Sequence, residues 1–291
     1  MISDPEKPAS SRKARRVLVL FVIFALCVGA AWWLGSYRGR ALARGEKIIA
    51  KMRQTGLPAA WPGPAWARWF LISRGGRNVG WQVRFRQPRP KGGFAGGEMR
   101  VELSATGPIR LTSRWLLNDQ ASAGTYLSDV SVLSRSGTVL LRRAMYSARI
   151  HLEQSLLDVQ QHIHGGKYVS QADEPAGYIP EGTMDVVLGL VARYKTTAKF
   201  RMILDSQPPE GDWTRFVVVE LAYRDNIKPL SPGGSVVQVT IAKQKQLYFL
   251  DKTGLVEKQT SDQSQELAVT RAKVLAEFPD AANMLAEFRQ R

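Results

Sequence analysis

Apolar and polar residues alternate with a period of two over most of the chain from Trp66 onward, and this alternation predicts an antiparallel sheet. Met99, Val101 and Leu103 alternate with polar residues, for example, and the same pattern resumes after the turn at Gly107. Such strands bury one face and leave the other in water. Further strands are expected at residues 67–73, 79–86, 126–133, 138–152, 156–164, 197–204, 214–223, 235–242, 246–251 and 255–259.

One internal segment follows a helical period instead. Met184, Val187, Leu188 and Val191 have the i, i+3, i+4, i+7 spacing of a helix with one apolar face. Such a face needs a sheet to cover it, so we expect a curved antiparallel sheet, a half-barrel, that wraps a central helix. Residues 266–278 and a segment from Pro279 onward are expected to form C-terminal helices.

Residues 17–35 form an uninterrupted apolar run of 19 residues, VLVLFVIFALCVGAAWWLG. As a helix it would be about 28 Å long, close to the thickness of a bilayer core, and it predicts a transmembrane helix at 17–36. A short basic N-terminus favours an N-in orientation with the domain outside the cytoplasm. A cleaved signal peptide is the alternative, but its best cleavage site, at 41–43, lies well beyond the run. A lipoprotein signal at Cys27 lacks the small residue that should precede the cysteine.

The chain therefore divides into five segments. We expect a cytoplasmic basic tail at 1–16, the transmembrane helix at 17–36, and a juxtamembrane helix with a proline-rich linker at 37–65. The β-rich domain is expected at 66–262 and a C-terminal helical segment at 263–291.

The net charge of +16 is concentrated beside the predicted membrane span and in the first half of the domain. Residues 68–149 carry 14 Lys and Arg against 4 Asp and Glu. Charge of this kind serves solubility or attracts a polyanion. Outside the cytoplasm nucleic acid is not an expected partner, whereas anionic lipid is, so Arg84, Arg86, Arg142 and Arg143 are candidate headgroup contacts.

Motifs that carry enzyme chemistry are not found in the sequence. It has no Gly-x-Ser-x-Gly and no His-Glu-x-x-His, and its single cysteine, Cys27, excludes an intrachain disulfide. His162 and His164 would share one strand face, but a metal site needs at least a third ligand, which the fold would have to supply from His151 or Asp173. We therefore expect no catalytic residue, no metal and no cofactor.

Aromatic and apolar residues offer one candidate binding surface. Trp69, Trp81, Trp115, Met184 and Leu188 could line a groove for an amphiphile on the concave face of the sheet. The alternative is that they fill the core, where aromatic residues contribute most to packing.

Three segments carry a resemblance to a known family. Residues 69–81 (WFLISRGGRNVGW), 178–184 (YIPEGTM) and 246–258 (QLYFLDKTGLVEK) resemble the opening hairpin, the mid-domain segment and the closing strand-turn-strand of an uncharacterised family of bacterial envelope proteins. That family is similar in fold to periplasmic lipoprotein-carrier half-barrels, which bind acyl chains in their concave face. Together with the predicted span at 17–36, the resemblance implies a single-pass protein of the bacterial inner membrane with an extracytoplasmic domain. It supplies no catalytic residue.

The sequence is compatible with two functions. The first is the binding of a lipid or other amphiphile in the concave sheet. The second is a non-catalytic protein–protein interaction module of an envelope assembly.

Overall fold

The computed structural model describes residues 10–60, 65–104, 107–134, 137–163, 165–203 and 215–290. Several predictions fall partly outside these ranges: residues 1–9 of the basic tail, part of the proline-rich linker at 61–64, and the ligand candidate His164.

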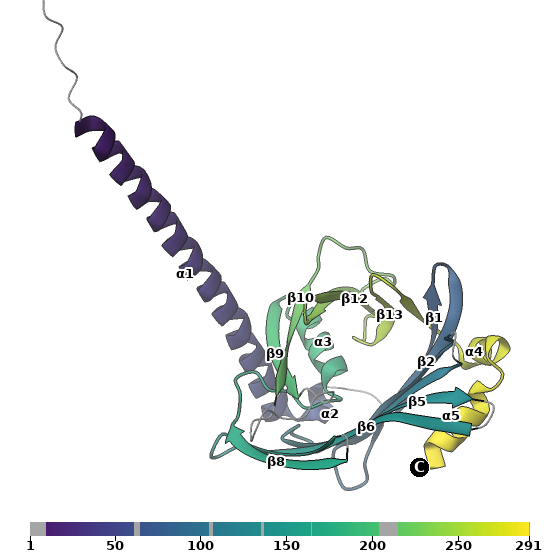
Figure 1. Ribbon diagram of the computed structural model, residues 1–291. Helices are drawn as coiled ribbons and strands as arrows, with labels where there is room; N and C mark the ends of the chain where they lie inside the picture. Colours follow the sequence, from purple (N-terminus) through teal and green to yellow (C-terminus); the bar gives the residue numbers. More distant parts are fainter. Residues whose placement is uncertain are drawn as a thin grey trace, which may run out of the picture.

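One antiparallel sheet dominates the described part of the chain. Its 14 strands follow the order β8-β7-β6-β5-β4-β3-β2-β1-β14-β13-β12-β11-β10-β9. Two meanders, β1 to β8 and β9 to β14, are joined where β1 pairs with β14. The sheet curls strongly but does not close (Figure 1), which confirms the prediction of a curved antiparallel sheet.

The strands of the first meander are β1 (Trp66–Arg74), β2 (Arg77–Pro88), β3 (Phe94–Glu102), β4 (Ile109–Leu117), β5 (Ala123–Ser134), β6 (Gly137–His151), β7 (Leu156–Ile163) and β8 (Gly166–Asp173). Those of the second are β9 (Thr197–Ile203), β10 (Phe216–Tyr223), β11 (Ser235–Ile241), β12 (Gln244–Leu250), β13 (Val256–Thr260) and β14 (Gln265–Val269).

Two strands were not expected from the sequence. β8 completes one end of the sheet, and β14 occupies residues for which the sequence predicts the start of a helix. The helix prediction for 266–270 is wrong because this segment is needed to bridge β1 and β13: Leu71 pairs with Leu267, and Lys258 pairs with Leu267 from the other side. The helix begins only at Arg271, where the Thr270 hydroxyl accepts a hydrogen bond from the Lys273 backbone N–H at 3.3 Å.

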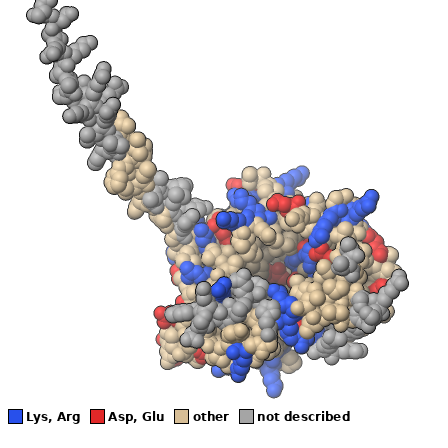
Figure 2. Space-filling view, viewed as in Figure 1, with Lys and Arg blue, Asp and Glu red and all other residues tan. Residues whose placement is uncertain are grey.

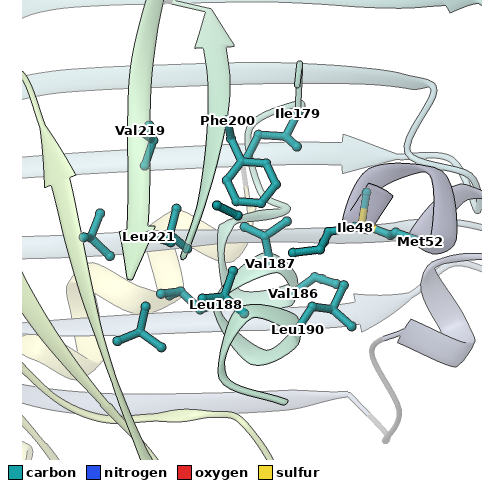
Figure 3. Packing of buried hydrophobic residues seen from close by; sticks show 14 of the residues in the cluster. Ile48, Met52, Ile179, Val186, Val187, Leu188, Leu190, Phe200, Val219 and Leu221 are labelled. Carbon is teal, nitrogen blue, oxygen red and sulfur yellow. The ribbon is translucent and has the colours of Figure 1, made fainter. Parts of the chain in front are cut away.

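The helix α3 (Met184–Arg193) lies inside the curve and packs against β10 and β11. Val187, Leu188 and Val191 are fully buried, as the helical spacing predicts. They belong to the main core, which also includes Phe200, Val219 and Leu221 from the strands (Figure 3). Burying each such aliphatic side chain contributes about 1.5–3 kcal/mol to folding, so α3 is a structural part of the domain.

The long helix α1 (Ser10–Thr55) ends inside the same core. Its residues Ile48, Ile49 and Met52 are buried there, together with Leu57 of the short helix α2 (Leu57–Ala60). The helix packs along β9, the last strand of the sheet (Figure 1). The segment predicted as a juxtamembrane helix and linker therefore contributes its helical part to the folded domain.

The seam between the two ends of the sheet is filled by α1 and by the chain that follows β8. Arg201 of β9 exchanges backbone hydrogen bonds of 2.8 Å with Gly177 and Ile179. Arg53 of α1 pairs with Glu174 at 2.6 Å. These contacts cover the edge of β9 that would otherwise expose unpaired backbone groups.

The helices α4 (Arg271–Glu277) and α5 (Ala281–Gln290) cover part of the outer face of the sheet (Figure 1). Val274, Ala281 and Leu285 form a second core there with residues of β1, β2 and β3. The middle of the sheet is consequently buried on both faces.

Within the described residues, no helix has both the length and the apolarity needed to cross a membrane. The transmembrane helix at 17–36 thus stays a prediction. The model places that segment within α1.

Candidate functional site

A cavity of about 360 Å³ lies between α3 and the concave face of the sheet. We call it the interior cavity. On the face seen in Figure 2 the domain is hollowed, with basic side chains beside the opening. One part of the cavity wall is apolar or aromatic and consists of Trp66, Trp115, Met184, Met202, Val217 and Ile241. The volume falls within the range of small-molecule sites, roughly 300–1,000 Å³.

Another part of the cavity wall is charged, because β2 and β3 turn polar residues inward. Arg84 of β2 pairs in register with Glu98 of β3, and the Arg84 Nε atom lies 3.6 Å from Glu98 Oε2. The Arg84 Nη2 atom lies 3.2 Å from Glu266 Oε2 and donates a 2.8 Å hydrogen bond to Gln259. Arg100 also pairs with Glu266, whose side chain is 3% exposed. We refer to Arg84, Glu98, Arg100 and Glu266 as the charged cluster.

Burial changes the acid–base behaviour of this wall. It raises the pKa of Glu98, and the nearby Arg84 only partly opposes that effect. For Arg84, burial alone would lower the pKa, but Glu98 and Glu266 outweigh it and the pKa rises. Arg84 therefore stays charged, and strongly perturbed groups gathered in a cavity are typical of functional sites.

Asp185, in the first turn of α3, completes the site. It lines the interior cavity but forms no hydrogen bond or ion pair with any residue that the structure describes. Burial raises its pKa, against the opposing effects of Arg84 and Arg86.

The raised pKa of Asp185 has a consequence for stability. A carboxyl group whose pKa is higher in the folded state stabilises the fold at low pH and loses that contribution as the pH rises through the folded-state pKa. We expect Asp185→Asn to unfold at a higher temperature than the wild type at neutral pH, with the difference shrinking as the pH is lowered. Thermal unfolding of both proteins over a pH series measures this, and a difference independent of pH would contradict it.

The five residues predicted to form one amphiphile groove occupy two places. Trp115, Met184 and Leu188 belong to the interior, with Trp115 and Met184 lining the cavity and Leu188 buried behind them. Trp69 and Trp81 lie on the outer face under α4 and α5, with ring centroids 5.9 Å apart. Their register explains this, since Trp69 pairs with Val83 and therefore points away from Arg84. The five residues therefore do not form the single groove that we expected from the sequence.

The four predicted headgroup arginines do not share a surface either. Arg84 lies in the charged cluster, and Arg86 is 1% exposed, with its guanidinium 5.1 Å from the Phe94 ring centroid. Arg143 on β6 makes two hydrogen bonds with Asp129, of 2.7 and 2.8 Å. Its neighbour Arg142 points to the opposite face of that strand. Only Arg84 of the four lines the interior cavity.

Glu98, Asp185 and Glu266 were not singled out from the sequence. Strand alternation assigns the apolar residues of β2 to the core and its polar residues to water. Here α4 and α5 cover the apolar face, so the polar residues face the interior instead. One feature of the sequence indicated that both faces of this hairpin are covered. Both faces of β2 carry large side chains, with Trp81 on one face and Arg84 on the other.

Two of the three histidines, His151 and His162, lie within the described residues. His151 lies 2.6 Å from Asp158, and His162 pairs in register with Lys167 on β8. Among the residues that the structure describes, no group of three metal-binding side chains is found.

The fold has a counterpart among solved structures. A β-barrel-like protein with a domain of unknown function, DUF1849, from Brucella abortus is similar with a TM-score of 0.53 at 12% identity, over 71% of this chain and 96% of that chain. A DUF1089 family protein from Pseudomonas aeruginosa, 12% identical over 67% of this chain and 89% of that chain, has a TM-score of 0.23, too low to carry an argument. No protein-family model matches the sequence, and no curated protein is similar to it.

These comparisons establish a β-barrel-like fold shared with a protein of unknown function, as the resemblance to an uncharacterised family led us to expect. A shared fold does not transfer function. The expected link to lipoprotein carriers stays a prediction.

Proposed function

We propose that this protein is a membrane-anchored envelope protein that binds a small amphiphile in its interior cavity, without catalysing a reaction. The apolar wall formed by Met202, Val217 and Ile241 receives the alkyl part of the ligand. The polar head lies against the charged cluster and Asp185. The observation that carries the proposal is that one open cavity is lined both by apolar residues and by charged residues.

The position of α1 supports the membrane part of the proposal. The predicted span at 17–36 and the buried residues Ile48 and Met52 belong to one continuous helix. A span in that helix would hold the domain beside the bilayer surface, so a ligand drawn from the membrane would have a short path to the cavity.

Filling the cavity tests the proposal. Val217 lines the cavity, whereas Val218, the next residue of β10, is 49% exposed on the other face. We expect full-length wild-type protein, extracted from its membrane in mild detergent, to carry a co-purifying amphiphile that mass spectrometry detects. Val217→Trp should lower its amount at least about tenfold, because the indole occupies the space of the alkyl chain.

Val218→Trp is the matched control and should carry as much amphiphile as the wild type. Equal loading of all three proteins, or no amphiphile in the wild type, would contradict the proposal.

A second candidate function rests on a groove of about 870 Å³ that is lined in part by outer-face residues and shares Trp66, Phe85, Trp115 and Tyr126 with the interior cavity. We call it the outer groove, and Phe85, Leu116, Leu127, Met145 and Leu285 are among its lining residues. Leu116 and Met145 are each 41% exposed. Exposed apolar surface of this kind is typical of protein interfaces, so the alternative is an interaction module of an envelope assembly. A photo-crosslinking residue at position 116 that captures a protein in native membranes would favour this alternative, and capture of lipid alone would count against it.

A further inference from the structure

The arginines that line the interior cavity have more hydrogen-bonding partners than its carboxylates have. Both oxygens of Glu266 are engaged, one by Arg100 and the other by Arg84. Arg100 is also bound by Glu102. The arginines of the cavity wall therefore already have carboxylate partners, and a ligand would have to compete with these ion pairs to reach them.

The acceptors, in contrast, are open. Glu98 accepts a 2.8 Å hydrogen bond from Gln82 at Oε2, and no hydrogen bond within the described residues reaches its Oε1 atom. Both oxygens of Asp185 lack such a partner in the same part of the chain. Two donors also lack partners there, Arg84 Nε and Trp66 Nε1, but both atoms are buried and out of reach of a ligand in the cavity.

The aromatic wall adds a second preference. Trp115 and Tyr126 line the same cavity as Asp185. The faces of such rings attract cations. Open carboxylate oxygens and aromatic rings in one cavity are together suited to an ammonium group.

We infer that the interior cavity selects amphiphiles with a protonated amine as the head group, and that Asp185 and Glu98 are the residues that accept its hydrogen bonds. The inference deepens the proposed function and rests on it. It reverses the expectation from composition, because a chain with a net charge of +16 should attract anions. The cavity offers the opposite, since its arginines already have carboxylate partners, whereas Asp185 and the Oε1 atom of Glu98 receive no hydrogen bond from the described residues.

The test compares three probes with the same alkyl chain: decylamine, decanol and decanoate. Each is titrated below its micellar concentration into the full-length protein in non-ionic detergent, and binding is measured by isothermal titration calorimetry. We expect decylamine to bind at least about tenfold more tightly than decanoate, with decanol between them. Nonspecific attraction to the basic chain would give the opposite order, so it cannot produce this result.

Two variants locate the effect. Asp185→Asn and Glu98→Gln should each reduce decylamine affinity several-fold while leaving decanol binding within about twofold. Asp225→Asn removes an equal charge from an exposed turn residue and should leave the affinities for decylamine and decanol unchanged. Decylamine affinity should also fall as the pH is lowered, because protonation neutralises the two carboxylates.

The outcomes separate the two proposals. Decanoate binding as tightly as decylamine, or an amine preference that survives in Asp185→Asn and Glu98→Gln, would overturn the head-group inference while cavity binding stands. If none of the three probes binds and Val217→Trp loses no co-purifying amphiphile, both proposals fail.

Discussion

Replacing Glu266 with alanine should lower the free energy of unfolding by about 3–5 kcal/mol. Glu266 is 2% exposed and pairs with both Arg84 and Arg100. Without it, two guanidinium groups in the interior lose the carboxylate that joins them, and breaking a buried ion pair is strongly destabilising even though Arg84 keeps Glu98 and Arg100 keeps Glu102. Denaturant-induced unfolding of the full-length protein in detergent, followed by tryptophan fluorescence, measures the loss.

The exposed pair of Asp129 and Arg143 provides the control. It has good geometry, with two hydrogen bonds, but the Arg143 side chain is 56% exposed. Asp129→Ala should change the free energy of unfolding by less than about 1 kcal/mol. Equal losses in Asp129→Ala and Glu266→Ala would show that the charged cluster is not a buried network.

Replacing Gly45 with alanine should also destabilise the domain, by about 1–3 kcal/mol. A Cβ atom at this position of α1 would lie 2.0 Å from the backbone carbonyl oxygen of Lys199 in β9. Helix and strand would have to move apart, which would open the contact that covers the seam of the sheet. Thermal unfolding of the full-length protein measures the effect.

Gly39 lies on the same helix and has no atom within 4 Å of the corresponding position. Gly39→Ala should be neutral or stabilise by up to about 1 kcal/mol, since alanine favours helix over glycine. If Gly45→Ala behaved like Gly39→Ala, α1 would not pack against β9 as described.

The strands and α3 could be predicted because their periodicity is local. The spacing of Val187, Leu188 and Val191 is enough to predict a buried helix face. The buried part of α1 carried a similar signal, since Ile48, Ile49 and Met52 fall on one helical face. That signal was obscured because the segment follows a strongly apolar run and precedes a proline-rich stretch.

The candidate site could not be predicted because it depends on which elements meet. Arg84 and Asp185 line the cavity from β2 and α3, and the β1–β14 pairing brings Glu266 of β14 into contact with Arg84. Trp69 and Trp81 were assigned to the concave face because C-terminal helices on the outer face were not foreseen to cover them. Packing of distant segments, which alternation does not encode, decided both outcomes.

The proposed amphiphile site is the space between α3 and the concave face of the sheet. Anomalous diffraction from crystals of the full-length protein grown with a terminally brominated alkylamine would locate the ligand. We expect bromine density beside Met202, Val217 and Ile241. Bromine density confined to the outer groove near Leu116 and Met145, or to the predicted span at 17–36, would contradict it.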